Sequence, residues 1–299
     1  MFKPQGIFTA LVTPMHQDET LNEQELRTQV DRQIQEGAAG LFCLGTNGEF
    51  YALSLEERIR LVSVLSEQNA GRLPLIVNVG CVTTQETIKL AKESAKRGVD
   101  ALSIIVPYYA ALTQDQLYDH FVAVAQAVDV PTMIYNIPQR TGNAITIKTV
   151  ARLKKIDTII GIKDSSGKVD HLDQLLTLVD DDFCLLIGTD SLILSLLQKG
   201  ASGAVAGCAN PFPAILNGIY NAWKRGDTEL AQRLQASIVP FRETFAYGNP
   251  NSVVKRAVEL MGYPVGPARA PARIDDTSVD ERIAASIAEV NRIAAGTGA

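Results

Sequence analysis

Residues 159–164 read IIGIKD, a short apolar run that closes on an amine and a carboxylate. Such a run predicts a buried strand of a parallel sheet, because both faces of that kind of sheet are covered by helices. Lys163 then stands where the strand meets a loop, and burial there lowers the pKa of its amine from about 10.4. A neutral amine in a pocket attacks ketones and forms a Schiff base. Many strand-end lysines simply extend to water. Whether Lys163 is a reactive amine therefore has to be judged from the rest of the sequence.

Seven other runs of this kind alternate with segments of helical periodicity. Strands that alternate with helices predict a parallel sheet. Eight strand–helix units within about 220 residues predict a closed (β/α)8 TIM barrel rather than an open sheet. With Ile159–Lys163, the predicted strands are Ile7–Val12, Gly40–Leu44, Leu75–Val79, Ala101–Val106, Thr132–Tyr135, Phe183–Ile187 and Gly203–Ala206.

Helix signals support this division of the chain. Ser54 and Glu57 have the spacing of a capping box, and Thr113 marks another helix start. Helices are expected to end at glycines, here Gly71, Gly98, Gly200 and Gly226. We therefore predict a catalytic barrel over residues 1–225 and a three-helix extension over residues 226–299.

The composition excludes several classes of protein. The chain has 299 residues, 46% of them hydrophobic, and its 28 basic and 33 acidic residues give a net charge of −5. This balance argues against a nucleic-acid surface. The four cysteines are far apart and lack metal-ligand spacing, so we expect buried free thiols. No signal peptide or membrane span is evident, and we expect a cytoplasmic protein.

In TIM barrels, chemistry is concentrated where the strands end. The predicted strand ends carry Thr46 to Gly48, Tyr108 and Tyr109, Tyr135, Lys163, and Gly188 to Asp190, with Arg140 close behind strand five. The three histidines (His16, His120 and His171) fall in predicted loops or helices, and we expect them at the surface. The few carboxylates lack metal-ligand spacing, so we expect neither a metal nor another cofactor.

The strand-end residues suit imine chemistry. The Tyr135 phenol can act as a general acid and base, and the Thr46 hydroxyl could link it by hydrogen bonds to a second phenol. The Gly45–Gly48 turn gathers backbone N–H groups that bind a carboxylate, as in a 2-oxo acid. Arg140 offers a planar fork for a second carboxylate. Each residue also has a purely structural interpretation, such as a turn glycine or a surface arginine.

Taken together, these motifs resemble the pyruvate-dependent Schiff-base lyases, the dihydrodipicolinate synthase and N-acetylneuraminate lyase superfamily. The resemblance covers nearly the whole chain and implies no cofactor. It implies that Lys163 forms the imine with pyruvate and that Thr46 relays protons between Tyr135 and Tyr109 of a neighbouring subunit. It further implies a pocket lined by Asn47, Gly48, Gly188 and Val205, and a homotetramer built as a dimer of dimers. The matching stretches are residues 11–14, 45–49, 107–109, 135–138 and 161–163.

The subfamily is less clearly marked. Arg140 and the Tyr108-Tyr109 pair look like the 4-hydroxy-tetrahydrodipicolinate synthases, which join pyruvate to L-aspartate 4-semialdehyde in lysine biosynthesis. Asn47 and Phe50 look more like catabolic aldolases or dehydratases of a 2-keto-3-deoxy sugar acid or a 4-hydroxy-2-oxo acid. Phe50 and Val82 occupy positions that bind feedback lysine in regulated synthases, so we expect no strong lysine inhibition. A non-catalytic binding protein on the same barrel remains a third class.

Overall fold

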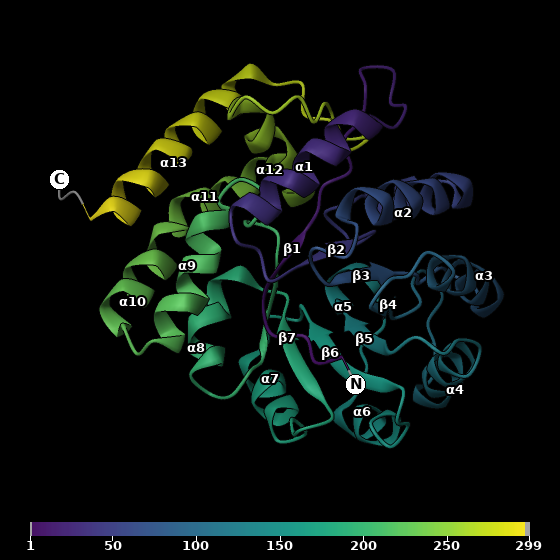
Figure 1. Cartoon of the computed structure of the whole chain (residues 1–299). Helices are drawn as coiled ribbons and strands as arrows, with labels where there is room; N and C mark the ends of the chain where they lie inside the picture. Colours follow the sequence, from purple (N-terminus) through teal and green to yellow (C-terminus); the bar gives the residue numbers. More distant parts are fainter. Residues whose placement is uncertain (1, 297–299) are drawn as a thin grey trace.

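The computed structural model describes residues 2–296, and its centre is a closed barrel of eight parallel strands (Figure 1). Each strand pairs with the next along the chain, and the last pairs with the first. This arrangement confirms the predicted (β/α)8 TIM barrel. The strands are β1 (Gly6–Ala10), β2 (Gly40–Cys43), β3 (Leu75–Asn78), β4 (Ala101–Ile105), β5 (Thr132–Asn136), β6 (Ile159–Asp164), β7 (Cys184–Ile187) and β8 (Gly203–Ala206).

Helices cover the outside of the barrel. The capping box before α2 is present, since the Ser54 hydroxyl accepts from the Glu57 N–H and the Glu57 carboxylate accepts from the Ser54 N–H. The helices between the strands are α1 (Glu23–Gln35), η1 (Phe50–Ala52), α2 (Leu55–Asn69), α3 (Thr84–Ala95), α4 (Gln114–Ala125), α5 (Pro138–Thr141), α6 (Ile147–Leu153), α7 (Val169–Leu176), η2 (Asp190–Leu192) and α8 (Ile193–Leu197), and α9 (Pro213–Lys224) follows β8.

The C-terminal extension differs from the three helices predicted. It contains α10 (Thr228–Ser237), α11 (Val239–Glu243), η3 (Thr244–Tyr247), α12 (Pro250–Leu260) and α13 (Thr277–Ala295), so the described part has four α-helices. Pro240 explains the extra division, because proline lacks the N–H that would continue α10. Residues 297–299, the end of the predicted extension, lie outside the described residues.

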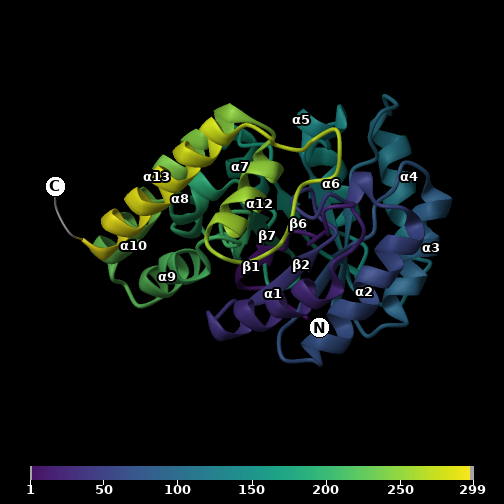
Figure 2. The same ribbon diagram turned by 90° about the horizontal axis from the view of Figure 1, so that it is seen from above.

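The extension packs against one side of the barrel. The helices α10, α12 and α13 gather there, and α2, α3 and α4 lie on the opposite side (Figure 2). The predicted boundary at residue 225 falls between α9 and α10, which pack against each other. The two parts therefore share a packed interface.

The structure corrects one expectation about the histidines. His120 is not at the surface: its side chain is buried on α4, where its Nδ1 lies 2.9 Å from the Thr84 hydroxyl. Burial lowers the pKa of His120 to about 4. His16 is exposed and His171 is half-buried. The four cysteines are buried and free, as predicted.

Within residues 2–296, no helix combines the length and apolar character needed to cross a bilayer. The same residues bring together no group of three or more histidines, cysteines or acids that is placed to hold a metal ion.

Candidate active site

Lys163 and Tyr135 lie side by side at the ends of β6 and β5. They are register partners, and residues in register on parallel neighbours face the same way. The Lys163 Nζ lies 3.8 Å from the centroid of the Tyr135 ring and 4.2 Å from that of Phe42. Lys163 is only 4% exposed. The barrel therefore holds one amine against two aromatic faces.

The surroundings of Lys163 change its protonation. Burial lowers the pKa of its amine from 10.5 to about 7, against the opposing effect of the Asp190 carboxylate. An amine with that pKa is about half neutral at pH 7. Lys163 is therefore ready to act as a nucleophile without a separate base.

Tyr135 is joined to Thr46 by a hydrogen bond. The two hydroxyl oxygens lie 2.7 Å apart, and either group can donate. Burial raises the pKa of Tyr135 to about 12, with the hydroxyls of Thr46 and Ser165 partly offsetting the effect. The phenol is therefore protonated at neutral pH. It can deliver a proton beside Lys163 and exchange it through Thr46.

The last residues of β5 and β6 fix the positions of this pair. Asn136 and Asp164, the next residues of the two strands, are also register partners, and the Asn136 amide donates to the Asp164 carboxylate at 2.7 Å. Ser166 donates to the other carboxylate oxygen through its N–H and its hydroxyl. Burial raises the pKa of Asp164, but these bonds and His171 outweigh it and hold the pKa below the usual value. An ionised Asp164 thus locks the two strand ends together.

The turn after β2 carries the predicted carboxylate-binding residues. A side chain at Gly45 would collide with the Phe42 ring, because an added Cβ would lie 2.8 Å from it. An added Cβ at Gly48 would lie 3.1 Å from the Leu11 carbonyl oxygen. The Thr13 hydroxyl donates to the Gly48 carbonyl at 2.7 Å. Tight packing therefore leaves little room for a side chain at Gly45 and only a close fit at Gly48.

A cavity of about 380 Å³ opens at this end of the barrel. It brings together seven of the predicted site residues. These are Thr46, Asn47, Tyr135, Arg140, Lys163, Gly188 and Val205.

The glycines after β7 and β8 keep part of this cavity open. A Cβ added at Gly188 would lie 1.9 Å from the Ser165 hydroxyl oxygen, and one added at Gly207 would lie 2.8 Å from the Asn47 amide nitrogen. Asp190 holds the turn after β8, accepting from the Gly207 N–H at 3.3 Å and the Cys208 N–H at 2.8 Å. These contacts fix the part of the cavity wall that follows β7 and β8.

Arg140 lies on α5 at the rim of the cavity. Its side chain is exposed, and within the described residues it makes no ion pair. It also borders a neighbouring cavity of about 230 Å³ that contains Phe50, Tyr51 and Tyr108. Its guanidinium is therefore available to an anionic group entering from solvent.

Two predicted site residues do not line the main cavity. Gly48 lies behind Thr46 and Asn47 in the turn, and contributes through packing. Tyr109 is 97% exposed, with a backbone φ of 78°. Within one chain, Tyr109 therefore does not take part in the Thr46–Tyr135 pair.

Sequence reasoning missed several residues that line the cavity. Asp190 is among the predicted strand-end residues but has no predicted role, and Ser165, which directly follows β6, is absent from them although its position offers a signal. The C-terminal extension contributes Arg242, Phe245, Pro250, Asn251 and Val254, and nothing in the local sequence marks them. Only the packing of α11, η3 and α12 against the barrel brings them there.

Comparisons with known proteins agree with this geometry. The sequence profile of the dihydrodipicolinate synthetase family matches residues 3–289. A 4-hydroxy-tetrahydrodipicolinate synthase of Methanopyrus kandleri is 37% identical over 273 residues, which cover 90% of this chain and 91% of that protein.

Solved structures show the same architecture. The 4-hydroxy-tetrahydrodipicolinate synthase of Methylacidiphilum fumariolicum has a TM-score of 0.93 at 31% identity, with 98% of each chain covered. A prophage protein of E. coli K12, solved in complex with pyruvate, has a TM-score of 0.92 at 28% identity and covers 96% of this chain and 98% of its own. The likeness thus includes the barrel and most of the extension.

Proposed function

Because the chain belongs to the dihydrodipicolinate synthetase family, a family of class I Schiff-base lyases, we propose that it condenses pyruvate with L-aspartate 4-semialdehyde. The product is 4-hydroxy-tetrahydrodipicolinate, an intermediate of lysine biosynthesis. One observation carries the proposal: a buried Lys163 with a pKa of about 7 lies against Tyr135, whose hydroxyl is bonded to Thr46. Relatives named for this reaction support the choice of substrates.

The reaction begins at the neutral amine. The Lys163 nitrogen attacks the ketone carbon of pyruvate, and loss of water leaves an imine. Loss of a proton from the methyl carbon gives an enamine, which attacks the aldehyde carbon of the second substrate. The amine of that substrate then closes onto the imine carbon and displaces Lys163. Tyr135 and Thr46 supply and remove the protons at these steps.

Two carboxylates must be held during the reaction. We assign the carboxylate of pyruvate to the turn that contains Thr46 and Asn47, which borders the cavity beside Lys163. Arg140, exposed at the rim and without an ion pair among the described residues, is assigned to the carboxylate of the semialdehyde.

One observation favours a second candidate. The Asn47 side chain lies against Gly207, since a Cβ added there would be 2.8 Å from the Asn47 amide nitrogen, and Phe50 lines the neighbouring cavity. These residues suit a catabolic aldolase or dehydratase that cleaves or dehydrates a 2-keto-3-deoxy sugar acid or a 4-hydroxy-2-oxo acid. Arg140 would then hold the far carboxylate of a dicarboxylic substrate.

The test is to trap the imine. The protein is incubated with pyruvate and borohydride, and the intact mass and peptide masses are measured. We expect one reduced pyruvate on the Lys163 peptide and none after Lys163→Met. A folded protein without an adduct would refute the proposal and favour a binding protein.

The partner is identified by rate assays. Pyruvate with L-aspartate 4-semialdehyde is compared with the cleavage or dehydration of 2-keto-3-deoxy sugar acids and 4-hydroxy-2-oxo acids. In the first assay, Arg140→Ala is expected to raise KM for the semialdehyde, whereas pyruvate trapping is unchanged. An unchanged KM would contradict the assignment of Arg140.

We further propose that the protein is a cytoplasmic homotetramer built as a dimer of dimers, in which Tyr109 enters the neighbouring subunit's site. The nearly complete exposure of Tyr109 in one chain supports such a role. Sedimentation of the protein tests the assembly. A Tyr109→Phe variant that keeps the wild-type turnover would contradict the shared relay.

A further inference from the structure

A buried ion pair lies behind the carboxylate-binding turn. The Lys255 ammonium is 2.9 Å from one oxygen of the Glu49 carboxylate, and both residues are 1% exposed. The other Glu49 oxygen accepts from the Arg269 N–H at 2.8 Å. Both partners are thus removed from water, and both Glu49 oxygens are bonded to the C-terminal extension.

Glu49 ends the turn that contains Thr46 and Asn47. Its N–H donates to the Thr46 carbonyl at 3.1 Å, and its own carbonyl accepts from the Ala52 N–H at 2.8 Å. Its φ of 54° is a left-handed conformation that non-glycine residues seldom adopt. The ion pair therefore holds the turn at a residue whose backbone conformation is otherwise unfavourable.

The helix that carries Lys255 also lines the cavity. Lys255 lies on α12, and three other residues of that helix, Pro250, Asn251 and Val254, line the cavity that contains Lys163. One ion pair consequently joins two walls of the same cavity, although its partners are 206 positions apart in the chain.

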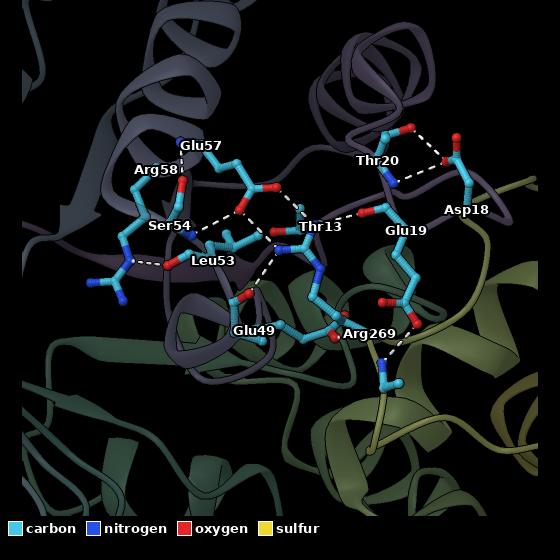
Figure 3. Close-up of polar contacts among 12 residues, drawn as sticks. Thr13, Asp18, Glu19, Thr20, Glu49, Leu53, Ser54, Glu57, Arg58 and Arg269 are labelled. Carbon is cyan, nitrogen blue, oxygen red and sulfur yellow. Dashed lines mark hydrogen bonds and ion pairs between the residues drawn. The ribbon is translucent and has the colours of Figure 1, made fainter.

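Arg269 anchors the segment that follows the turn (Figure 3). Its guanidinium lies 2.7 and 2.9 Å from the two oxygens of Glu57 and donates to the Ala52 carbonyl at 2.7 Å. It also donates to the Glu19 carbonyl at 2.5 Å. The extension thus contacts Glu49, Ala52 and Glu57 along the segment that leads from β2 into α2. Of these three, Glu49 is the closest in sequence to Thr46 and Asn47, which line the cavity.

Stability does not explain this ion pair well. Burying two charges costs desolvation energy that their attraction seldom exceeds, and apolar replacements of such pairs are often neutral or stabilising. Burial indeed lowers the pKa of Lys255, against the attraction of Glu49. Its position between the turn and α12 suggests a different role.

We propose that Glu49 and Lys255 form a positioning pair that sets the affinity for the 2-oxo acid by holding the Thr46–Asn47 turn at a fixed distance from Lys163. This inference rests on the proposed function. Neither residue lines the cavity, so the pair acts on binding through the turn and leaves the chemistry of the amine unchanged.

The test variant is Glu49→Gln with Lys255→Met, which leaves no charge buried alone. Its matched control is Arg256→Met, on the same helix, which removes ion pairs to Asp280 and Glu259 away from the cavity. Pyruvate is trapped on Lys163 with cyanoborohydride at several pyruvate concentrations and pH values. Thermal unfolding of each variant is measured in parallel.

For the double variant we expect the half-saturating pyruvate concentration to rise by about tenfold or more, because small misplacements of binding groups cost that much. The maximal trapping rate and its pH midpoint stay at the wild-type values. Arg256→Met lowers the melting temperature and leaves half-saturation unchanged. Glu49→Asp, which keeps the charge but shortens the side chain, gives an intermediate rise.

The outcomes separate the two proposals. Wild-type half-saturation in Glu49→Asp, or in a folded double variant, would overturn the positioning role while adducts still form. An equal rise in Arg256→Met would also overturn it, because general loosening of α12 would then be sufficient. A wild-type protein that forms no adduct would overturn the proposed function and this inference with it.

Discussion

The low pKa of Lys163 predicts that the catalytic amine costs the protein stability at neutral pH. The pKa of the Lys163 amine is about 7 in the folded protein, and an unperturbed lysine, as in the unfolded chain, has a pKa of 10.5. Because the folded pKa is the lower one, the unfolded chain binds the extra proton between these values. The free energy of unfolding therefore rises with pH between these values. The destabilisation caused by burying Lys163 is absent above pH 10.5 and grows as the pH falls toward 7.

The magnitude follows from the two pKa values. Between them, the free energy of unfolding changes by about 1.4 kcal/mol per pH unit for one proton. At pH 7 the burial of Lys163 lowers the free energy of unfolding by about 4 kcal/mol relative to alkaline pH. Lys163→Met removes this cost and is expected to be more stable than the wild type at pH 7.

The assay is urea unfolding of both proteins from pH 7 to pH 9, at one protein concentration. The fluorescence of Trp223, the single tryptophan, reports the transition. The wild-type free energy of unfolding should rise relative to that of Lys163→Met by about 2 kcal/mol across this range. Lys89→Met, at an exposed position on α3, is the control for the substitution itself.

A difference between wild type and Lys163→Met that stays constant from pH 7 to pH 9 would refute the reasoning. It would mean that the amine keeps its charge in the folded protein, and therefore that burial does not prepare Lys163 for attack.

Three further predictions concern the same site. Tyr135→Phe removes the proton carrier and should reduce turnover by about 10²–10⁴-fold with little change in half-saturating pyruvate; a small loss in steady-state rate would contradict its role. Gly188→Ala would place a Cβ 1.9 Å from the Ser165 hydroxyl oxygen; it should destabilise the protein by about 1–3 kcal/mol, measured by denaturant unfolding, and an unchanged midpoint would contradict this packing. L-Lysine should not inhibit strongly, because the buried Phe50 ring packs edge-on against Tyr108; half-inhibition by submillimolar lysine in the rate assay would refute this.

Much of the fold could be predicted because its signals are local. The apolar run ending at Lys163 became β6, and the predicted strand at Thr132–Tyr135 became β5 with one more residue. Pairing between sequential parallel strands then places Lys163 and Tyr135 next to each other without further information.

The errors occurred where local signals were weak. His120 looked like a surface residue in a predicted helix, but it faces the interior of the fold and bonds to Thr84. The extension was expected to contain three helices, and Pro240 divided it further. Tyr109 is not among these errors: it was expected to reach the site of a neighbouring subunit, it is exposed within one chain, and its role stays a prediction.

The sequence by itself determined the strand-and-helix order and the amine at the end of β6, because hydrophobic period and capping are properties of neighbouring residues. Only the tertiary structure decided which distant residues complete the cavity. Arg242 and Asn251 reach it from the extension, and Lys255 meets Glu49 across 206 positions. Contacts of that kind depend on how whole helices pack, and no local pattern encodes them.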